Sequence, residues 1–248
     1  MNSQLNVYNV CADSGELGPG GTLKLQGYHE LICDLMEQNE IATGNSISET
    51  IKQGYAWAII SLSMEVLRPV CSCEWLTGQT WLSEAPGGIF PYYRREIIFY
   101  NTAGETMFSA SLYLVKLDTE THKIFSTDGD EEVCIQPFGK TVEWAVPRLR
   151  DRGEYTFLHS RSIYPSDIDA LGHLNNCRYG AFTYDAAMMN GMNYTVHPFC
   201  YTINFIRQYM PDDTVEISVR SENDRFFVSG GSSGSSRKHF ISCLSPLK

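Results

Sequence analysis

The stretch "YPSDIDALGHLNNCRY", residues 164–179, joins a cluster of reactive polar side chains to the expected start of a helix. Two aspartates, a histidine and two asparagines lie within ten positions, and Tyr179 follows them. Asparagine is a favoured N-cap residue, so a helix is expected to begin at about Asn175. The motif alone allows two interpretations. One is a polar loop that only caps a helix, and the other is a catalytic loop beside the positive end of a helix dipole.

The residues around this motif predict a strand, a loop, a helix and further strands. Residues 154–164 form a strand-like run before it. After it, Tyr179, Phe182, Ala186 and Met189 recur at the spacing of one helical stripe. Strand-like runs then resume at 201–210, 214–222, 225–231 and 237–245.

The first half of the chain repeats this plan. Residues 23–39 place Tyr28, Leu31, Ile32 and Leu35 at helical spacing. The run "YAWAIISLSMEVLR" (55–68) then alternates with the period of a strand, and a turn at "NTAGET" follows two strands later. Periodicity therefore predicts an α+β protein with two similar halves and a boundary within residues 136–153.

Composition narrows the function classes. The 248 residues are 43% hydrophobic, and 29 acidic against 19 basic side chains give a net charge of −10, which disfavours nucleic acid as a partner. No apolar run is long enough to span a membrane, and the first residues lack the features of a signal peptide, so a cytoplasmic protein is expected. Eight cysteines without a C-x-x-C pair predict no metal site.

Residues 166–179 resemble a signature of the acyl-acyl carrier protein thioesterases, S-D-x-D-x-N-x-H-x-N-N-x-x-Y. Residues 50–82, 94–118 and 201–217 also resemble strands of that family, so the resemblance covers roughly residues 20–225. The matching positions of the signature are Ser166, Asp167, Asp169, His173, Asn175, Asn176 and Tyr179.

This resemblance implies a tandem (double) hot-dog fold, in which each half is a long helix wrapped by a curved antiparallel sheet. It implies an N-terminal domain over residues 1–145 that binds the acyl chain and a C-terminal domain over residues 146–248 that carries the catalytic loop and helix. The implied activity is hydrolysis of fatty acyl-acyl carrier protein in fatty acid biosynthesis. The implied partner is acyl carrier protein, no cofactor is implied, and both a monomer and a homodimer are compatible.

The resemblance also suggests roles for individual residues. Asp169 would act as base, nucleophile or water-orienting group, and His173 would share its proton or polarise the carbonyl. Asn175 and Asn176 would mark the helix N-terminus that stabilises the oxyanion. Asp167 is expected to stabilise the loop.

Two aromatic residues, Trp57 and Tyr28, are candidates for the acyl pocket, with plain core packing as the alternative. The first-half loop "GPGGT" (18–22) corresponds by position to the Asp169 loop but has no histidine. One catalytic loop per chain is therefore expected. Surface arginines, such as Arg148, Arg150 and Arg178, are candidates for contacting the carrier protein.

Two positions depart from the family pattern. Leu171 replaces its usual asparagine, and Gln208 aligns with a position that usually carries a carboxylate. Leucine has no hydrogen-bonding side chain and glutamine is no base, although Gln208 can still position a water. Two alternatives therefore stay open: an acyl-CoA thioesterase of the hot-dog type, and a non-catalytic hot-dog protein that binds acyl chains or carrier protein.

Overall fold

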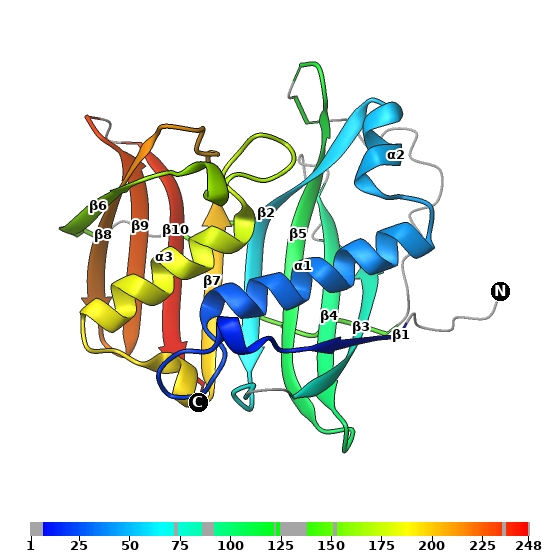
Figure 1. Cartoon of the computed structure of the whole chain (residues 1–248), viewed down its shortest axis with the longest axis horizontal. Helices are drawn as coiled ribbons and strands as arrows, with labels where there is room; N and C mark the ends of the chain where they lie inside the picture. Colours follow the sequence, from blue (N-terminus) through cyan, green and yellow to red (C-terminus); the bar gives the residue numbers. More distant parts are fainter. Residues whose placement is uncertain are drawn as a thin grey trace.

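One antiparallel sheet forms the framework of the computed structural model, which describes residues 7–71, 74–85, 92–121, 123–124, 138–150, 153–234 and 237–247. Its ten strands run in the order β1-β3-β4-β5-β2-β7-β10-β9-β8-β6 (Figure 1). The strands are β1 (Val7–Cys11), β2 (Tyr55–Val66), β3 (Trp75–Ser83), β4 (Tyr93–Asn101), β5 (Thr106–Asp118), β6 (Thr156–Ser162), β7 (Phe199–Phe205), β8 (Thr214–Glu222), β9 (Arg225–Ser232) and β10 (Lys238–Pro246).

The strand order is symmetric about the pair β2–β7. The first-half strands β1-β3-β4-β5-β2 are followed by their second-half counterparts in reverse, β7-β10-β9-β8-β6. This order describes two similar halves related by a pseudo-two-fold axis. At the centre, Ser63 lies opposite Thr202, and their hydroxyl oxygens are 3.4 Å apart.

Two long helices, α1 (Leu25–Ala42) and α3 (Asn176–Met189), lie across one face of the sheet (Figure 1). The shorter elements are α2 (Ile47–Lys52) and the 3-10 turns η1 (Ser14–Glu16), η2 (Pro165–Asp167) and η3 (Tyr194–Val196). The core fills the space between the long helices and the sheet, and it buries Tyr28 and Leu31 of α1 and Phe182 of α3. Met189 is 59% exposed, so the buried stripe of α3 ends before it.

A buried polar network joins the opposite face of the sheet to the segment 138–150 that connects the halves. Arg94 and Glu96 of β4 form an ion pair of 2.6 Å, and both side chains are buried. Glu96 accepts hydrogen bonds from the Thr141 amide (2.9 Å) and hydroxyl (2.8 Å), and Arg94 donates to the Val142 carbonyl (2.6 Å). These bonds hold the connecting segment against the sheet.

The predicted combination of helices with antiparallel strands, the α+β class, is confirmed. Strand β1 and helix α2 were not anticipated: β1 has five residues and α2 six, too few for a clear period. The predicted boundary lies between β5 and β6, and residues 136–137 and 151–152 of it are outside the described residues. In the described part of the chain, no helix is long and apolar enough to cross a membrane.

Candidate active site

Backbone hydrogen bonds fold the loop between η2 and α3 into a tight turn. The Asp169 amide donates to the His173 carbonyl (2.8 Å), and the Gly172 amide donates to the Asp169 carbonyl (3.0 Å). Gly172 has a φ of 82°, a conformation that glycine adopts without steric cost. Asp169 Oδ1 accepts from the amides of Leu171 (2.9 Å) and His173 (3.4 Å). The turn therefore brings Asp169 and His173 together.

Asp167 anchors this loop, as expected from its position. Its carboxylate is 1% exposed and forms ion pairs with Arg161 (2.7 Å) and Arg178 (2.6 Å). It also accepts a hydrogen bond from the Tyr164 amide (3.1 Å). Each donor satisfies a buried charge that would otherwise be costly, so Asp167 stabilises the loop.

The N-terminus of α3 leaves one amide available. Of the two asparagines expected at the helix N-terminus, Asn175 is the N-cap: its Oδ1 accepts from the Cys177 amide (2.8 Å) and its carbonyl from the Arg178 amide (2.9 Å). The Asn176 amide has no acceptor among the described residues. Since the helix dipole places positive potential there, this N–H is suited to bind an oxyanion.

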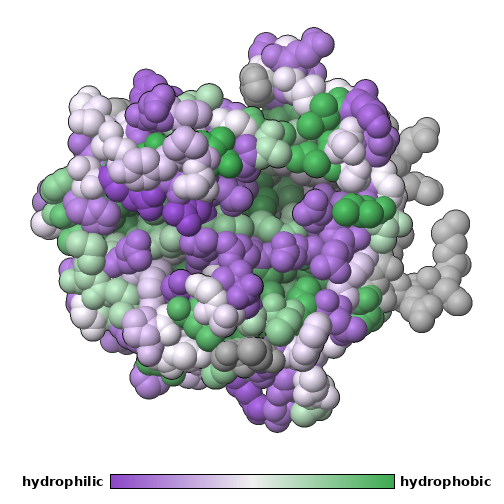
Figure 2. Space-filling view, in the orientation of Figure 1, coloured by the Kyte–Doolittle hydropathy of each residue, from purple (hydrophilic) through white to green (hydrophobic). Residues whose placement is uncertain are grey.

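A cavity of about 520 Å³ opens beside Asn176. Asp169, His173, Asn176 and Gln208 of the second half line it, as does Trp57 of the first half. Figure 2 shows a hollow in this region, above α1 and between the second-half loop and α2. The first half also supplies an apolar wall, made of Ile51, Ala56, Ala58, Ile59, Ile60, Val115, Leu117 and Ile124.

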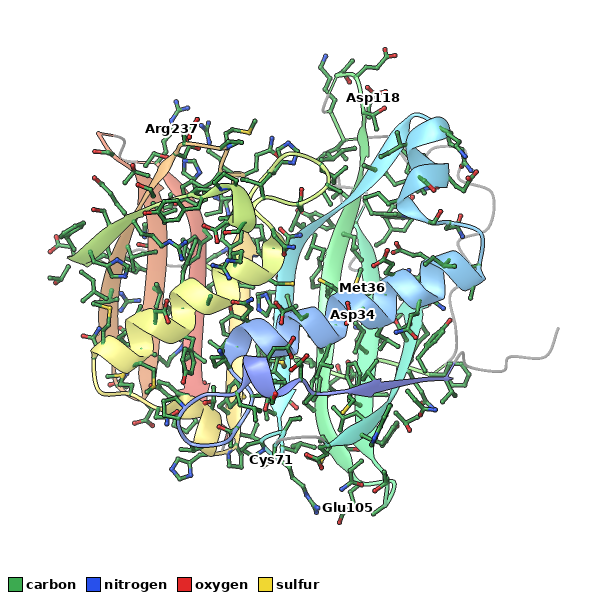
Figure 3. The ribbon with its side chains drawn as sticks, in the orientation of Figure 1. Asp34, Met36, Cys71, Glu105, Asp118 and Arg237 are labelled. Carbon is green, nitrogen blue, oxygen red and sulfur yellow. The ribbon has the colours of Figure 1, made fainter. Side chains whose placement is uncertain are left out.

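Two predicted site residues lie outside the cavity lining. Tyr28 is fully buried between α1 and the sheet, where its hydroxyl accepts from the Val70 amide (3.0 Å) and its ring packs edge-on against Phe108 and Phe199. Its position is that of a core residue. Asn175 contributes by capping α3. Figure 3 shows that side chains of both halves fill the space around the two long helices.

Several lining residues were not identified from the sequence. Ile51 lies on α2, which has no clear period, and Arg207 follows the end of β7. Leu171, noted as a departure from the family pattern, is 41% exposed and also lines the cavity. The alternation of residues 55–68 placed Ala56, Ala58 and Ile60 on one face of a strand, but Trp57 and Ile59 between them also line the cavity, so the alternation did not mark the lining residues.

The first-half loop (18–22) has the same backbone hydrogen bonds as the Asp169 loop, but it carries neither a carboxylate nor a histidine. Gly18 takes the place of Asp169 and Thr22 that of His173: the Gly18 amide donates to the Thr22 carbonyl (2.8 Å). The Gly21 amide donates to the Gly18 carbonyl (2.9 Å), as Gly172 does to Asp169. The backbone of the loop is duplicated, whereas its side chains are not.

Side chains of the second half occupy the space next to this first-half loop. A Cβ atom at Gly18 would overlap the Tyr184 hydroxyl, and one at Gly20 would come within 2.7 Å of Val196 Cγ1. Val196 belongs to η3, and Thr195 of the same turn lies 3.4 Å from Thr22 between hydroxyl oxygens. The space that corresponds to the cavity by pseudo-two-fold symmetry is therefore filled by side chains of the second half.

Burial shifts the pKa of one ionisable side chain in each half near the cavity. Burial raises the pKa of Tyr179, and the charge of Asp169 raises it further, so the Tyr179 hydroxyl remains protonated at neutral pH. On the first-half side, burial lowers the pKa of Lys116, whose Nζ lies 5.2 Å from the centroid of the Trp57 ring. Trp57 packs edge-on against Tyr93 at 4.8 Å.

Comparison with known proteins identifies the fold. No protein-family model and no curated protein sequence matches the chain. The structure is similar to an acyl-ACP thioesterase from Bacteroides thetaiotaomicron (TM-score 0.81, 16% identity, 97% of each chain covered). It is also similar to the 12:0-ACP thioesterase from Umbellularia californica (TM-score 0.80, 14% identity, 97% of this chain and 96% of that chain covered). The chain has the fold of these thioesterases.

Proposed function

We propose that the chain is a tandem hot-dog thioesterase that hydrolyses fatty acyl-acyl carrier protein. One observation carries the proposal: a single cavity combines an apolar wall from the first half with Asp169, His173 and the unpaired Asn176 amide from the second half. The apolar wall suits an acyl chain. The polar residues suit a thioester carbonyl at its end, so residues 1–145 would bind the chain and residues 146–248 would carry the chemistry.

The chemistry requires an activated water and a donor for the developing oxyanion. In the described part of the chain, Asp169 Oδ2 has no hydrogen-bond partner and is available to orient or deprotonate a water. The water oxygen attacks the carbonyl carbon, the Asn176 amide stabilises the oxyanion, and the C–S bond breaks. His173 relays the proton that Asp169 takes from the water to the leaving thiolate, so both side chains return to their starting states, and the products are a carboxylic acid and a thiol. Gln208 would hold the water.

Two features favour alternative functions. Leu171 and Gln208 line the cavity in place of groups with more hydrogen-bonding or acid–base capacity, which favours binding without turnover. Of the candidate carrier contacts, Arg178 is engaged by Asp167 and by Gln26 (3.2 Å). Arg207, which was not among those candidates, lines the cavity, where a guanidinium suits a phosphate group of CoA. An acyl-CoA substrate is therefore the second candidate.

The test is release of free thiol from a panel of acyl carrier protein and CoA thioesters. Asp169→Asn and His173→Ala are each expected to lower turnover about 100-fold, the usual scale for acid–base groups. Asp13→Asn is the matched control, because Asp13 caps η1, is not among the cavity-lining residues, and can be replaced as a cap by asparagine. Equal turnover in all variants would contradict the mechanism. Binding of acyl carrier protein without hydrolysis would identify a binding protein.

A further inference from the structure

His29 is a fully buried titratable residue that the proposed chemistry does not use. It lies on α1, its side chain is 2% exposed, and its Nδ1 is 3.3 Å from the Asn176 carbonyl oxygen. Asn176 is the first residue of α3, and it lines the cavity. A side chain from the first half thus contacts the residue that offers the oxyanion donor.

The protonation state of His29 follows from its surroundings. Burial lowers the pKa of His29 to about 4, so the imidazole is neutral at neutral pH. A carbonyl only accepts hydrogen bonds, so Nδ1 carries the proton and donates to Asn176. Nε2 then carries a lone pair, and it has no hydrogen-bond partner among the described residues. A buried, unpaired nitrogen destabilises the fold, and an apolar side chain at this position would avoid that cost.

The pseudo-two-fold symmetry between the helices is broken at this residue. In α3 the position equivalent to His29 is Gly180, where a Cβ atom would come within 3.1 Å of the backbone of Leu25 and Gln26. Backbone packs directly on backbone beside the filled first-half loop. An imidazole separates the helices beside the cavity. The helix contact made by a histidine therefore lies beside the cavity, and the contact made by a glycine lies beside the filled loop.

We propose that His29 is a positioning residue, which holds Asn176 so that its amide points to the place where the oxyanion develops. The inference rests on the proposed function, because it assigns His29 to that site. Misplacement of an active-site group by about 1 Å can cost about 100-fold in rate, so a hydrogen bond to the backbone of Asn176 is enough to affect turnover.

The test compares His29→Leu with His29→Asn. Leucine fills the volume and removes both the donor and the unpaired nitrogen. The kcat is therefore expected to fall about 10-fold to 100-fold, while KM and the thermal midpoint stay unchanged. Asparagine places an amide donor near the position of Nδ1, and its kcat is expected to stay within about threefold of wild type. Equal kcat in wild type and His29→Leu would overturn the proposal, as would parallel losses of activity and thermal stability in both variants.

Hydrogen exchange separates this inference from the proposed function. In His29→Leu the Cys177 amide, which donates to Asn175 Oδ1, is expected to exchange faster than in wild type, and in His29→Asn it is expected to exchange at the wild-type rate. This readout needs no substrate. A wild-type chain without hydrolytic activity would contradict the proposed function, and unchanged exchange in His29→Leu would contradict the positioning role.

Discussion

Asp167 is held by three hydrogen-bond donors, whereas Asp169, two residues later, keeps one carboxylate oxygen without a partner in the described part of the chain. The difference arises from the direction of each side chain. Asp167 contacts Arg161 of β6 and Arg178 of α3, and Asp169 lines the cavity. Two aspartates only two residues apart therefore differ in role: Asp167 is structural, and Asp169 is proposed to be catalytic.

A second carboxylate with unusual surroundings is Glu16 of η1. Burial, a hydrogen bond with Glu30 and the charges of Glu30 and Asp13 raise the pKa of Glu16 from 4.5 to about 8. Between these values the folded chain holds a proton that the unfolded chain releases, so stability falls as pH rises from about 5 to 8. The contribution is fully present below pH 4.5 and is lost as pH passes about 8.

We expect Glu16→Gln to reduce this pH dependence, because glutamine keeps a hydrogen-bond donor toward Glu30 and cannot ionise. Urea midpoints at pH 5, 6, 7 and 8 measure the effect, and the variant should lose less stability than wild type over this range. Glu49→Gln serves as the control, since Glu49 lies on the surface in an ion pair with Lys52. Identical slopes for wild type and Glu16→Gln would show that Glu16 is ionised throughout.

At the level of the elements, the contact between α1 and α3 sets how the two long helices approach. Gly180 of α3 allows this approach, because a Cβ atom there would come within 3.1 Å of the Leu25 carbonyl and the Gln26 amide. An alanine in place of glycine normally stabilises a helix interior by about 1 kcal/mol. Here the added methyl meets backbone, which has little freedom to move.

We therefore expect Gly180→Ala to lower the thermal midpoint, with a cost of about 1–3 kcal/mol from overpacking. Thermal unfolding followed by circular dichroism measures it. Gly15→Ala in η1 is the control, because a Cβ atom there comes no closer than 3.7 Å to another residue. A midpoint at or above the wild-type value for Gly180→Ala would mean that the two helices can separate without cost.

On the scale of the whole molecule, the connection between the halves depends on the ion pair of Arg94 and Glu96. Both charges are buried, and they bind Thr141 and Val142 of the connecting segment. Removing one partner leaves a buried, uncompensated charge. The stability of this connection is thus linked to two side chains of β4.

Glu96→Gln is expected to cost about 3–5 kcal/mol of unfolding free energy, because Arg94 would lose its counter-charge. It should also expose residues 138–150 to limited proteolysis. Urea unfolding and protease digestion measure the two effects. Glu105→Gln, which removes the exposed pair with Arg68, should leave both unchanged. Wild-type stability in Glu96→Gln would indicate that packing alone holds this segment.

The sequence by itself determined the local elements and the loop chemistry. The stripe of Tyr28, Leu31 and Leu35, the alternation of β2 and the Asn175 cap all follow from neighbours within a few residues, and each is present in the structure. Short elements without a full period, β1 and α2, could not be identified in this way.

Only the tertiary structure decided how these elements meet. The pairing of β2 with β7 and the filling of the first-half loop by η3 join residues far apart in the chain, as does the contact of His29 with Asn176. Periodicity shows which face of an element is buried, and it does not show what packs against that face. The cavity that unites Trp57 with Asp169 exists because the folded sheet places the two halves side by side.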